Sequence, residues 1–564
     1  MYTRKNTDTM IMLHNLTKGE KMPNFSNIKK LDTCIKVTTL IFGLIVFLSA
    51  WNCDDAYHGF ITVRNILNGN GFVYNIGERV NVCTCPLFVL ILTGFTFIFR
   101  EVTIVSYIIC TAFSTAAFYI IASNFCKDKW QLLFTFFATT GSYCFMSFTT
   151  SGLENSLLFL ELALFILVYS KNEEYDFKKL ILLAFIDSLV LFTRMDIGFM
   201  LFVPTAYVFL FKKKCSFIKM FGAGLIGLIP FFIWEIFSAF YFGSWFPNPF
   251  YVKVGTSIPV GDYIIHGIQY LLISFGYDLV LIVFIFIAIV RLLMDKKLSF
   301  KMFAIGMIVK LCWVIYMGGD FMVGRHFTDL FFVSITWILV VMNEEEKSIR
   351  ANDDKISANK WKLGLSIVLI LCISISINTR TTVMKSFLFP QNQYQCGEEK
   401  DWYYPTLGML PRLMTYISEG RDLTDDTWAG VATDVVKEAV DRGDRAMISL
   451  WAPGVLVYKY NEKIYLVDDL ALGDAFLSKF PSIYTNPWRV GHTKREVPVG
   501  YGESLFNNTN LIEDPDLRQY YDMFLEVTRG ELFSGKRVKL AFEFAMGKYD
   551  YLIKRYLSRK AAAQ

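Results

Sequence analysis

The chain has 564 residues, of which 54% are hydrophobic, 16% aromatic and only 19% charged. This composition excludes an ordinary soluble globular protein and is typical of a polytopic membrane protein. The net charge of +5 is modest, so charge gives no reason to expect nucleic acid as a partner.

The chain divides into three parts by composition. Residues 1–30 are polar and basic and predict a cytoplasmic tail, because the apolar segment that follows lacks a signal-peptide cleavage site. Residues 31–379 repeatedly offer about 20 apolar residues in a row, the length that a helix needs to cross a hydrocarbon core of roughly 30 Å. Residues 380–564 are mixed polar sequence and predict a soluble domain.

Basic residues orient the predicted helices, because short cytoplasmic loops are enriched in Lys and Arg. This rule predicts about eleven spans, with the N-terminus inside and the C-terminal domain outside the cytoplasm. The apolar stretch 86–99 would cover only about 21 Å, so we interpret it as a re-entrant or interfacial helix within the first outer loop, 52–101. The stretch 262–278 either lies on the outer surface or extends the following span.

In this topology the polar clusters that are not basic all lie on the outer face. The carboxylate pair Asp54-Asp55 follows the first predicted span, 34–51. Helix C-termini prefer cations, so two acids at this place favour a catalytic role over a solvated helix end. The other clusters are 150–154, 194–196, 246–253, 318–320 and Arg325-His326, and together they predict an active site covered by the soluble domain.

An acid pair beside several cations suits the attack of a hydroxyl on a sugar that a lipid phosphate activates. Asp54 or Asp55 would be the general base, a contribution of about 10² to 10⁴ in rate. The departing phosphate needs positive charge. Whether a divalent cation takes part is left open, and no metal-binding pair of histidines is present. The candidate donor-phosphate or substrate-binding residues are Arg79, Arg194, Asp196, Lys253, Asp320, Arg325, His326 and His492.

Several of these residues have structural alternatives. Arg194 and Asp196 are equally well explained as a mutual ion pair that anchors a short loop. Lys253 follows an aromatic stretch and is alternatively a lysine that reaches to the membrane interface. Glu154 is interpreted as a cap of the helix that follows, because acids are favoured in a first turn. The remaining alternatives are a surface turn for Arg79, a turn after two glycines for Asp320 and a structural histidine for His492.

A series of motifs runs in order along most of the chain. It comprises Asp54-Asp55-Ala56-Tyr57, Arg64-Asn65, 68–75, 77–80, 84–87, 150–154, 193–196, 247–253, 318–322 with Gly324-Arg325, 467–474 and 491–494. The series resembles that of type C (GT-C) glycosyltransferases of the terminal β-(1→2)-arabinofuranosyltransferase family. These enzymes cap cell-wall arabinan from a polyprenyl-phosphate donor.

The resemblance implies a polytopic α-helical membrane protein of the GT-C type with a C-terminal mixed α/β extracytoplasmic domain, in a bacterial plasma membrane. It implies transfer of arabinofuranose from a polyprenyl-phosphate sugar donor to a cell-envelope glycan acceptor, in a single displacement with an Asp general base. The sequence departs from the family at Met195, Cys85 and Ala471, where Pro, Asn or His, and Gly are usual. The resemblance therefore identifies a chemistry and leaves the sugar open.

Two other functions fit the pattern less closely. One is a lipid-phosphate-sugar transferase that modifies lipopolysaccharide, another polysaccharide or protein. The other is a transporter or flippase in which intramembrane carboxylates bind a coupling ion. The clustering of polar residues at one face and the lack of a repeat of broken helices argue against a transporter. A structural scaffold would leave the paired acids unexplained.

Local patterns add detail to the loop and the soluble domain. The segments 446–451, 455–460 and 463–467 predict short strands, and 428–440 and 511–527 predict helices. Aromatic residues of this domain are candidates for stacking on acceptor sugar rings, although aromatics are as often part of a core. Cys53, Cys83 and Cys85 fall in the outer part of the chain, where a disulfide could close the first loop.

Overall fold

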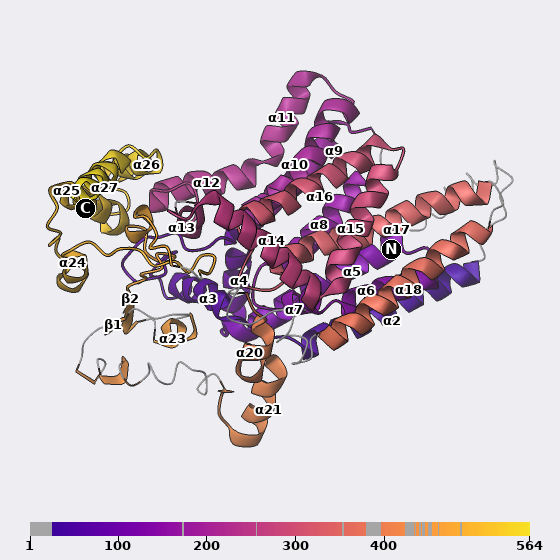
Figure 1. Cartoon of the computed structure of the whole chain (residues 1–564), viewed down its shortest axis with the longest axis horizontal. Helices are drawn as coiled ribbons and strands as arrows, with labels where there is room; N and C mark the ends of the chain where they lie inside the picture. Colours follow the sequence, from indigo (N-terminus) through magenta and orange to yellow (C-terminus); the bar gives the residue numbers. More distant parts are fainter. Residues whose placement is uncertain are drawn as a thin grey trace.

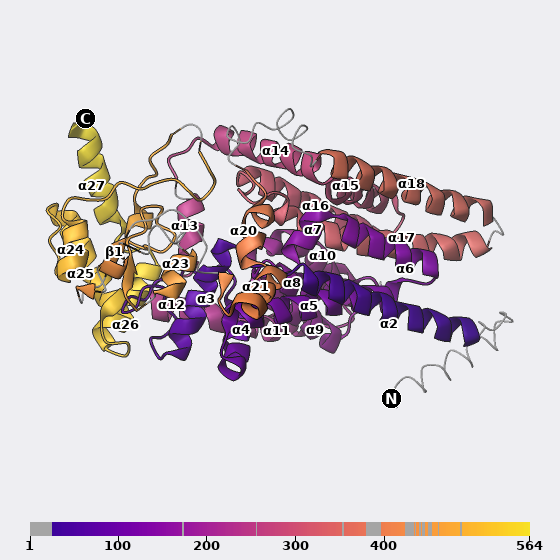
Figure 2. The same ribbon diagram turned by 90° about the horizontal axis from the view of Figure 1, so that it is seen from below.

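The structure, a computed structural model, describes residues 25–171, 174–254, 256–351, 355–379, 396–423, 434, 436–438, 441–442, 446–448, 454–460, 462–485 and 488–563. The described chain is predominantly helical. A bundle of long helices occupies most of the molecule, and the C-terminal helices lie together at one end of it (Figure 1). The 90° view shows the same division (Figure 2).

The part up to residue 379 contains helices of very different length. The long ones are α2 (Phe25–Leu48), α5 (Val102–Phe125), α9 (Phe177–Thr193), α14 (Val260–Tyr277), α15 (Leu279–Met294), α16 (Leu298–Tyr316), α17 (Thr328–Ala351) and α18 (Lys355–Thr379). The shorter ones are α3 (Asp54–Leu67), α4 (Pro86–Phe99), α6 (Lys129–Gly141), α7 (Tyr143–Phe148), α8 (Asn155–Tyr169), η1 (Met195–Ile197), α10 (Gly198–Tyr207), η2 (Val208–Lys212), α11 (Phe217–Gly227), α12 (Ile229–Phe242), α13 (Asn248–Val254) and η3 (Arg325–Phe327).

The bundle has the properties of an α-helical membrane protein. Six helices of the described chain are long and apolar enough to cross a membrane, and up to eight spans result if each of two bent helix pairs counts as one. The prediction of about eleven spans is therefore not confirmed by length and composition. Large apolar side chains point outward from the bundle, among them Leu40 (73% exposed), Phe202 (73%) and Ile218 (82%). Such exposure is unfavourable in water but is expected where side chains face lipid.

The ambiguous stretches become helices with clear breaks. The apolar stretch 86–99 forms α4 with the predicted bounds, and proline at its first position suits a helix start. Residues 262–277 of the other stretch lie within α14, which meets α15 at an angle of 112° with Asp278 between them. The stretch therefore does not continue α15 as a straight span. Asp278 makes the corner, because its carboxylate accepts hydrogen bonds from the backbone N–H of Leu281 and Cys144.

The C-terminal part consists of short elements followed by a helical group. Its elements are α20 (Glu399–Leu407), α21 (Met409–Glu419), β1 (Ala446–Ile448), α23 (Gly454–Lys459), β2 (Ile464–Leu466), η5 (Leu477–Lys479), α24 (Tyr501–Asn507), α25 (Pro515–Arg529), α26 (Gly535–Ala545) and α27 (Asp550–Ala563). Of the strand predicted at 446–451, residues 446–448 form β1 and the rest lies outside the described residues. The strand predicted at 463–467 is present as the shorter β2, and the helix predicted at 511–527 corresponds to α25. The predicted helix 428–440 lies largely outside the described residues.

One strand prediction in this part is wrong. Residues 455–460 were expected to form a strand, but residues 455–459 belong to the helix α23. The two strands β1 and β2 pair in parallel, with Ala446 opposite Ile464, so the connection between them has to cross back over the pair. Residues 455–457 are all buried, so their apolar run lacks the periodicity that separates a helix from a strand.

Backbone hydrogen bonds join the C-terminal part to the bundle. Gly397 exchanges hydrogen bonds with the segment after α16, as donor to Phe321 and acceptor from Val323. Gly408 lies opposite Trp51 in a single bridge, and the N–H of Met409 donates to the carbonyl of Ala50. The chain that follows residue 395 is thus fixed directly beside the start of α3.

Close helix packing in the bundle depends on small residues. A Cβ added at Gly306 of α16 would lie 2.1 Å from the carbonyl oxygen of Met200 on α10, whereas one at Gly364 of α18 would meet nothing within 4 Å. Small residues let membrane helices approach closely. We expect Gly306→Val to destabilise the protein by about 1–3 kcal/mol through overpacking and Gly364→Val to be tolerated. Thermal unfolding in one detergent compares the two, and equal stability would contradict this packing.

Candidate active site

The acid pair begins a helix and does not end one. Helix α2 ends at Leu48, and Asp54 and Asp55 form the first turn of α3. Acids in a first turn are favoured by the helix dipole, and Arg64 in the last turn is favoured for the same reason. The argument that two acids at this place oppose the dipole is therefore wrong, because it assumed that they belong to the end of the preceding helix.

Asp54 and Asp55 have different surroundings. The Asp54 side chain is 2% exposed, and its two oxygens accept hydrogen bonds from the backbone N–H groups of Gly454 and Val455, each at 3.1 Å. Asp54 thus caps the N-terminus of α23. Burial raises the pKa of Asp54 to about 7. Asp55, one residue later, turns into a cavity instead.

This cavity has a volume of about 270 Å³ and lies between the bundle and the C-terminal part. Apolar side chains of membrane helices, such as Trp234 and Trp313, line one portion of it. The predicted site residues that line it are Asp55, Arg194, Asp196, Lys253, Arg325, His326 and His492. Residues that lie hundreds of positions apart in the sequence therefore line the same cavity.

A buried ion network forms one wall of the cavity. Glu154 accepts a hydrogen bond from Arg194 at 2.6 Å and a second from Arg325 at 3.3 Å, so one carboxylate holds two guanidinium groups. Burial alone would raise the pKa of Glu154, but the two arginines lower it to about 2. Its side chain makes no capping hydrogen bond to α8. The interpretation of Glu154 as a helix cap is therefore wrong.

The network extends from Glu154 in two directions. Arg194 also pairs with Asp196, with 2.7 Å between Nε and the carboxylate, so the ion-pair alternative for these two residues is present in the geometry. Lys310, fully buried on α16, contacts Asp196 as well and lies 3.9 Å from Asp329. Asp196 is thereby held between two cations.

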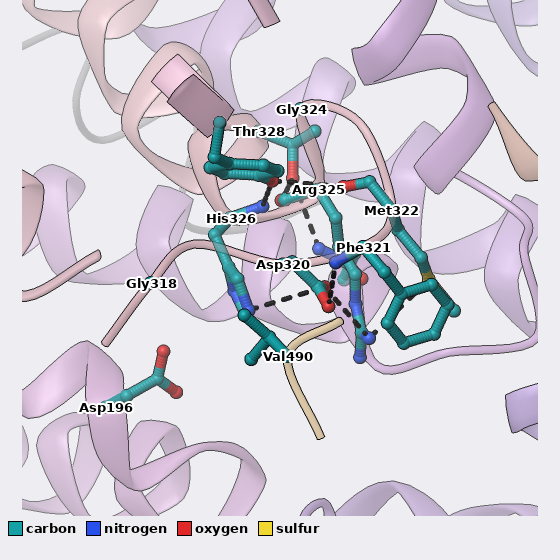
Figure 3. Close-up of polar contacts among 12 residues, drawn as sticks. Asp196, Gly318, Asp320, Phe321, Met322, Gly324, Arg325, His326, Thr328 and Val490 are labelled. Carbon is teal, nitrogen blue, oxygen red and sulfur yellow. Dashed lines mark hydrogen bonds and ion pairs between the residues drawn. The ribbon is translucent and has the colours of Figure 1, made fainter. Parts of the chain in front are cut away.

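In the other direction the network reaches Asp320, which is not a lining residue itself but contacts the lining residues Arg325 and His326 (Figure 3). Its carboxylate is 3.5 Å from Arg325 and 3.4 Å from His326, and it accepts the N–H of Phe321. Burial alone would raise the pKa of Asp320, but His326, Arg325 and Lys253 lower it to about 2. Gly319 beside it has a φ of +72°, and a Cβ there would lie 2.3 Å from Tyr270. Glycine is therefore required at this turn.

Among the described residues, Lys253 is a cation of the site that makes no direct contact with a carboxylate, although it acts on Asp320 from a greater distance. It lies on α13 and lines the cavity, and no carboxylate of the described chain lies within 4.0 Å of its ammonium group. Its side chain extends beside Gly491, where a Cβ would lie 3.2 Å from the Lys253 Cε. The positive charge of Lys253 is therefore available to an anion in the cavity.

His492 also reaches the cavity but is not a cation. Its Nδ1 lies 3.0 Å from the carbonyl oxygen of Val490, and its ring meets Phe321 edge-on with 4.7 Å between centroids. Burial lowers the pKa of His492 to about 4, with Arg489 as the next cause. At neutral pH it therefore offers an uncharged imidazole.

Arg79 lies away from the cavity. Its guanidinium donates hydrogen bonds to the backbone carbonyls of Val527 and Gly530, and its own N–H donates to Thr528. It holds the C-terminal end of α25 against the first loop. The structure thus gives Arg79 a role in domain contact and no place among the lining residues.

Sequence patterns missed several lining or supporting residues. His58 follows Asp55 by one helical turn, so an i,i+3 search from the acid pair would have found it. Asp468 lies within a motif that was noticed only as a whole. Lys310 had no local signal, because its partner Asp196 comes from a distant segment.

Neither a disulfide bond nor a metal-binding cluster is found among the described residues. Each of the eleven cysteines is a free thiol, including Cys53, Cys83 and Cys85. Within the described ranges no three His, Cys, Asp or Glu side chains are grouped so that they could hold a metal ion. The residues present therefore do not form a protein-only metal site.

Comparisons with known proteins found no family model, no curated protein and no solved structure that matches this chain. The resemblance to arabinofuranosyltransferases therefore stays a prediction.

The geometry separates the two acids experimentally. Asp54→Asn replaces one of two accepting oxygens by an N–H donor that faces a backbone N–H, which should cost about 1–3 kcal/mol. Asp55→Asn should change stability little, because no hydrogen bond to its carboxylate is present in the described chain. Hydrogen exchange of residues 454–459 in the purified proteins measures this, with faster exchange expected only for Asp54→Asn. Equal exchange in both variants would remove the capping role of Asp54.

Proposed function

We propose that this protein is a membrane glycosyltransferase that moves a sugar from a polyprenyl-phosphate donor to a cell-envelope glycan acceptor. The observation that supports this most directly is that the carboxylate of Asp55 and the ammonium group of Lys253 line the same cavity. A base and an anion-binding cation around a single space are what hydroxyl attack on a phosphate-activated sugar requires.

The proposed reaction is a single displacement. Asp55 accepts the proton of the acceptor hydroxyl as that oxygen forms a bond to the anomeric carbon of the donor sugar. The bond from the anomeric carbon to the phosphate oxygen breaks, and the lipid phosphate leaves with the electron pair. Lys253 stabilises the negative charge of the leaving phosphate, with the partly compensated Arg194 and Arg325 behind it.

The apolar part of the cavity wall suits a donor that carries a lipid chain. Leu191, Trp234, Trp313 and Met317 belong to it, and they come from or follow helices of the apolar bundle. A polyprenyl chain needs such surroundings, whereas a nucleotide sugar does not. The arabinofuranose of the resemblance is the first donor to test, and another lipid-phosphate sugar is the alternative within the same chemistry.

The basic loops of the sequence support an orientation of the protein in the membrane. We assign the protein to a bacterial plasma membrane as a multi-pass protein, with the N-terminus in the cytoplasm and the cavity and C-terminal part on the outer side. A donor carried by a lipid fits that side, where nucleotide sugars are not supplied.

The decisive variant is Asp55→Asn. In reconstituted vesicles with radiolabelled polyprenyl-phosphate arabinofuranose and a glycan acceptor, it should lower the transfer rate by about 10² or more, because the general base is lost. Asp262→Asn, an acid outside the cavity that pairs with Tyr484, is the matched control and should keep the wild-type rate. Transfer by the wild type from a different lipid-phosphate sugar would correct the sugar alone. No transfer from any such donor would favour a transporter.

A second prediction concerns the leaving group. Lys253→Met should lower kcat by about 10² to 10³, because the charge that stabilises the departing phosphate is removed, and Lys253→Arg should restore part of the rate. Lys494→Met, which removes a largely exposed lysine paired with Asp469, is the control. Initial rates at saturating donor and acceptor measure the effect. An unchanged kcat in Lys253→Met would exclude this residue from leaving-group stabilisation.

A further inference from the structure

A second group of lining residues has a chemistry unlike that of the ion network. His58, Tyr74, Asp468 and Gly473 all line the cavity and come from α3, the first loop and the C-terminal part. They are neighbours of one another. The His58 Nδ1 lies 3.1 Å from the Tyr74 hydroxyl, and a Cβ on Gly473 would lie 3.5 Å from both the Asp468 carboxylate and the Tyr74 ring.

This group carries no fixed positive charge. Asp468 accepts backbone N–H groups from Leu470 at 3.1 Å and Gly473 at 2.6 Å, and no Lys or Arg of the described chain lies within ion-pair distance of it. Each carboxylate oxygen keeps a free lone pair. A carboxylate and an imidazole that line the same cavity can bind the hydroxyl groups of a sugar, whereas the charge of Asp468 would repel a phosphate or carboxylate ligand.

Asp55 connects this group to the ion network. It precedes His58 by three residues on α3, so the two side chains share one face of the helix. In a displacement the attacking oxygen must approach from the side opposite the leaving group. If the phosphate lies at Lys253, the acceptor hydroxyl has to reach Asp55 from another part of the wall, and the His58 group is the polar surface next to Asp55.

We infer that His58, Tyr74, Asp468 and Gly473 form the acceptor subsite and that it takes the hydroxyl groups of an uncharged glycan while rejecting glycans with carboxylate or phosphate groups. This inference rests on the proposed function, whose donor side it does not involve. The C-terminal part contributes Asp468 and Gly473, so the acceptor specificity depends on residues outside the bundle.

The inference is tested by binding without any donor. Tetrasaccharides of arabinofuranose, mannose and galactose are titrated into the full-length protein in nanodiscs and compared with the mannuronate and galacturonate tetrasaccharides. At least one neutral tetrasaccharide should bind, and its uronate counterpart should bind at least tenfold more weakly. His58→Phe should weaken neutral binding at least tenfold, and His58→Gln should restore part of it.

Three further variants, one of them a control, test the roles of charge and of space in the subsite. Asp468→Asn should reduce the discrimination against uronates at least fivefold, whereas Asp469→Asn, whose acid lies next in sequence and pairs with Lys494 outside the cavity, should not. Gly473→Ala adds one methyl group at ordinary contact distances, so it should fold normally while weakening neutral binding by narrowing the subsite. Retained discrimination in Asp468→Asn would overturn the inference.

The outcomes also separate this inference from the proposed function. A wild-type protein that transfers sugar but binds uronate and neutral tetrasaccharides equally, or binds none of them, overturns the acceptor subsite alone. A protein that binds neutral tetrasaccharides through His58 and Asp468 but transfers from no lipid-phosphate sugar overturns the glycosyltransferase proposal and leaves a glycan-binding site.

Discussion

The sharing of Glu154 by two arginines is the interaction on which the cavity depends. An unpaired charge in such a buried place is very costly, and one carboxylate that contacts both Arg194 and Arg325 lowers that cost for each. Because Glu154 directly precedes α8, Arg194 directly follows α9 and Arg325 starts η3, the same contact fixes three helix ends around one space. The cations of the wall are therefore present before any ligand enters, which is what electrostatic preorganisation requires.

The second constraint is the connection between Asp54 and α23. Asp54 binds the backbone of the C-terminal part, and its neighbour Asp55 faces the cavity, so the position of the acid in the cavity is tied to the docking of a segment four hundred residues away. A Cβ on Gly454 would lie 2.3 Å from the Asp54 carbonyl oxygen, so the approach is as close as a backbone allows. Bundle and C-terminal part thus build one site.

Sequence patterns predicted the α-helical membrane class of the protein, and seven of the predicted site residues are among those that line the cavity. These predictions worked because composition and the placement of charge between apolar helices depend on local patterns. The predictions were wrong where the role or conformation of a residue depends on contacts with residues distant in the sequence. The local signal for Glu154 was a helix start, and only the two arginines give it another role. The apolar run 455–458 shows neither helical nor strand periodicity in the sequence. The helix that it forms is capped by hydrogen bonds to Asp54, a residue far away in the sequence.

Lys310 has a consequence for the biogenesis of the protein. It lies within the apolar helix α16, and a lysine at the centre of a membrane helix opposes insertion by about 2.5–3.5 kcal/mol. Its carboxylate partner Asp196 belongs to the earlier segment that leads into α10, against which α16 packs at Gly306. The lysine enters the bilayer at lower cost once that partner is beside it. Insertion of the later helix is thereby coupled to the earlier one, and assembly of the bundle follows the order of synthesis at this point.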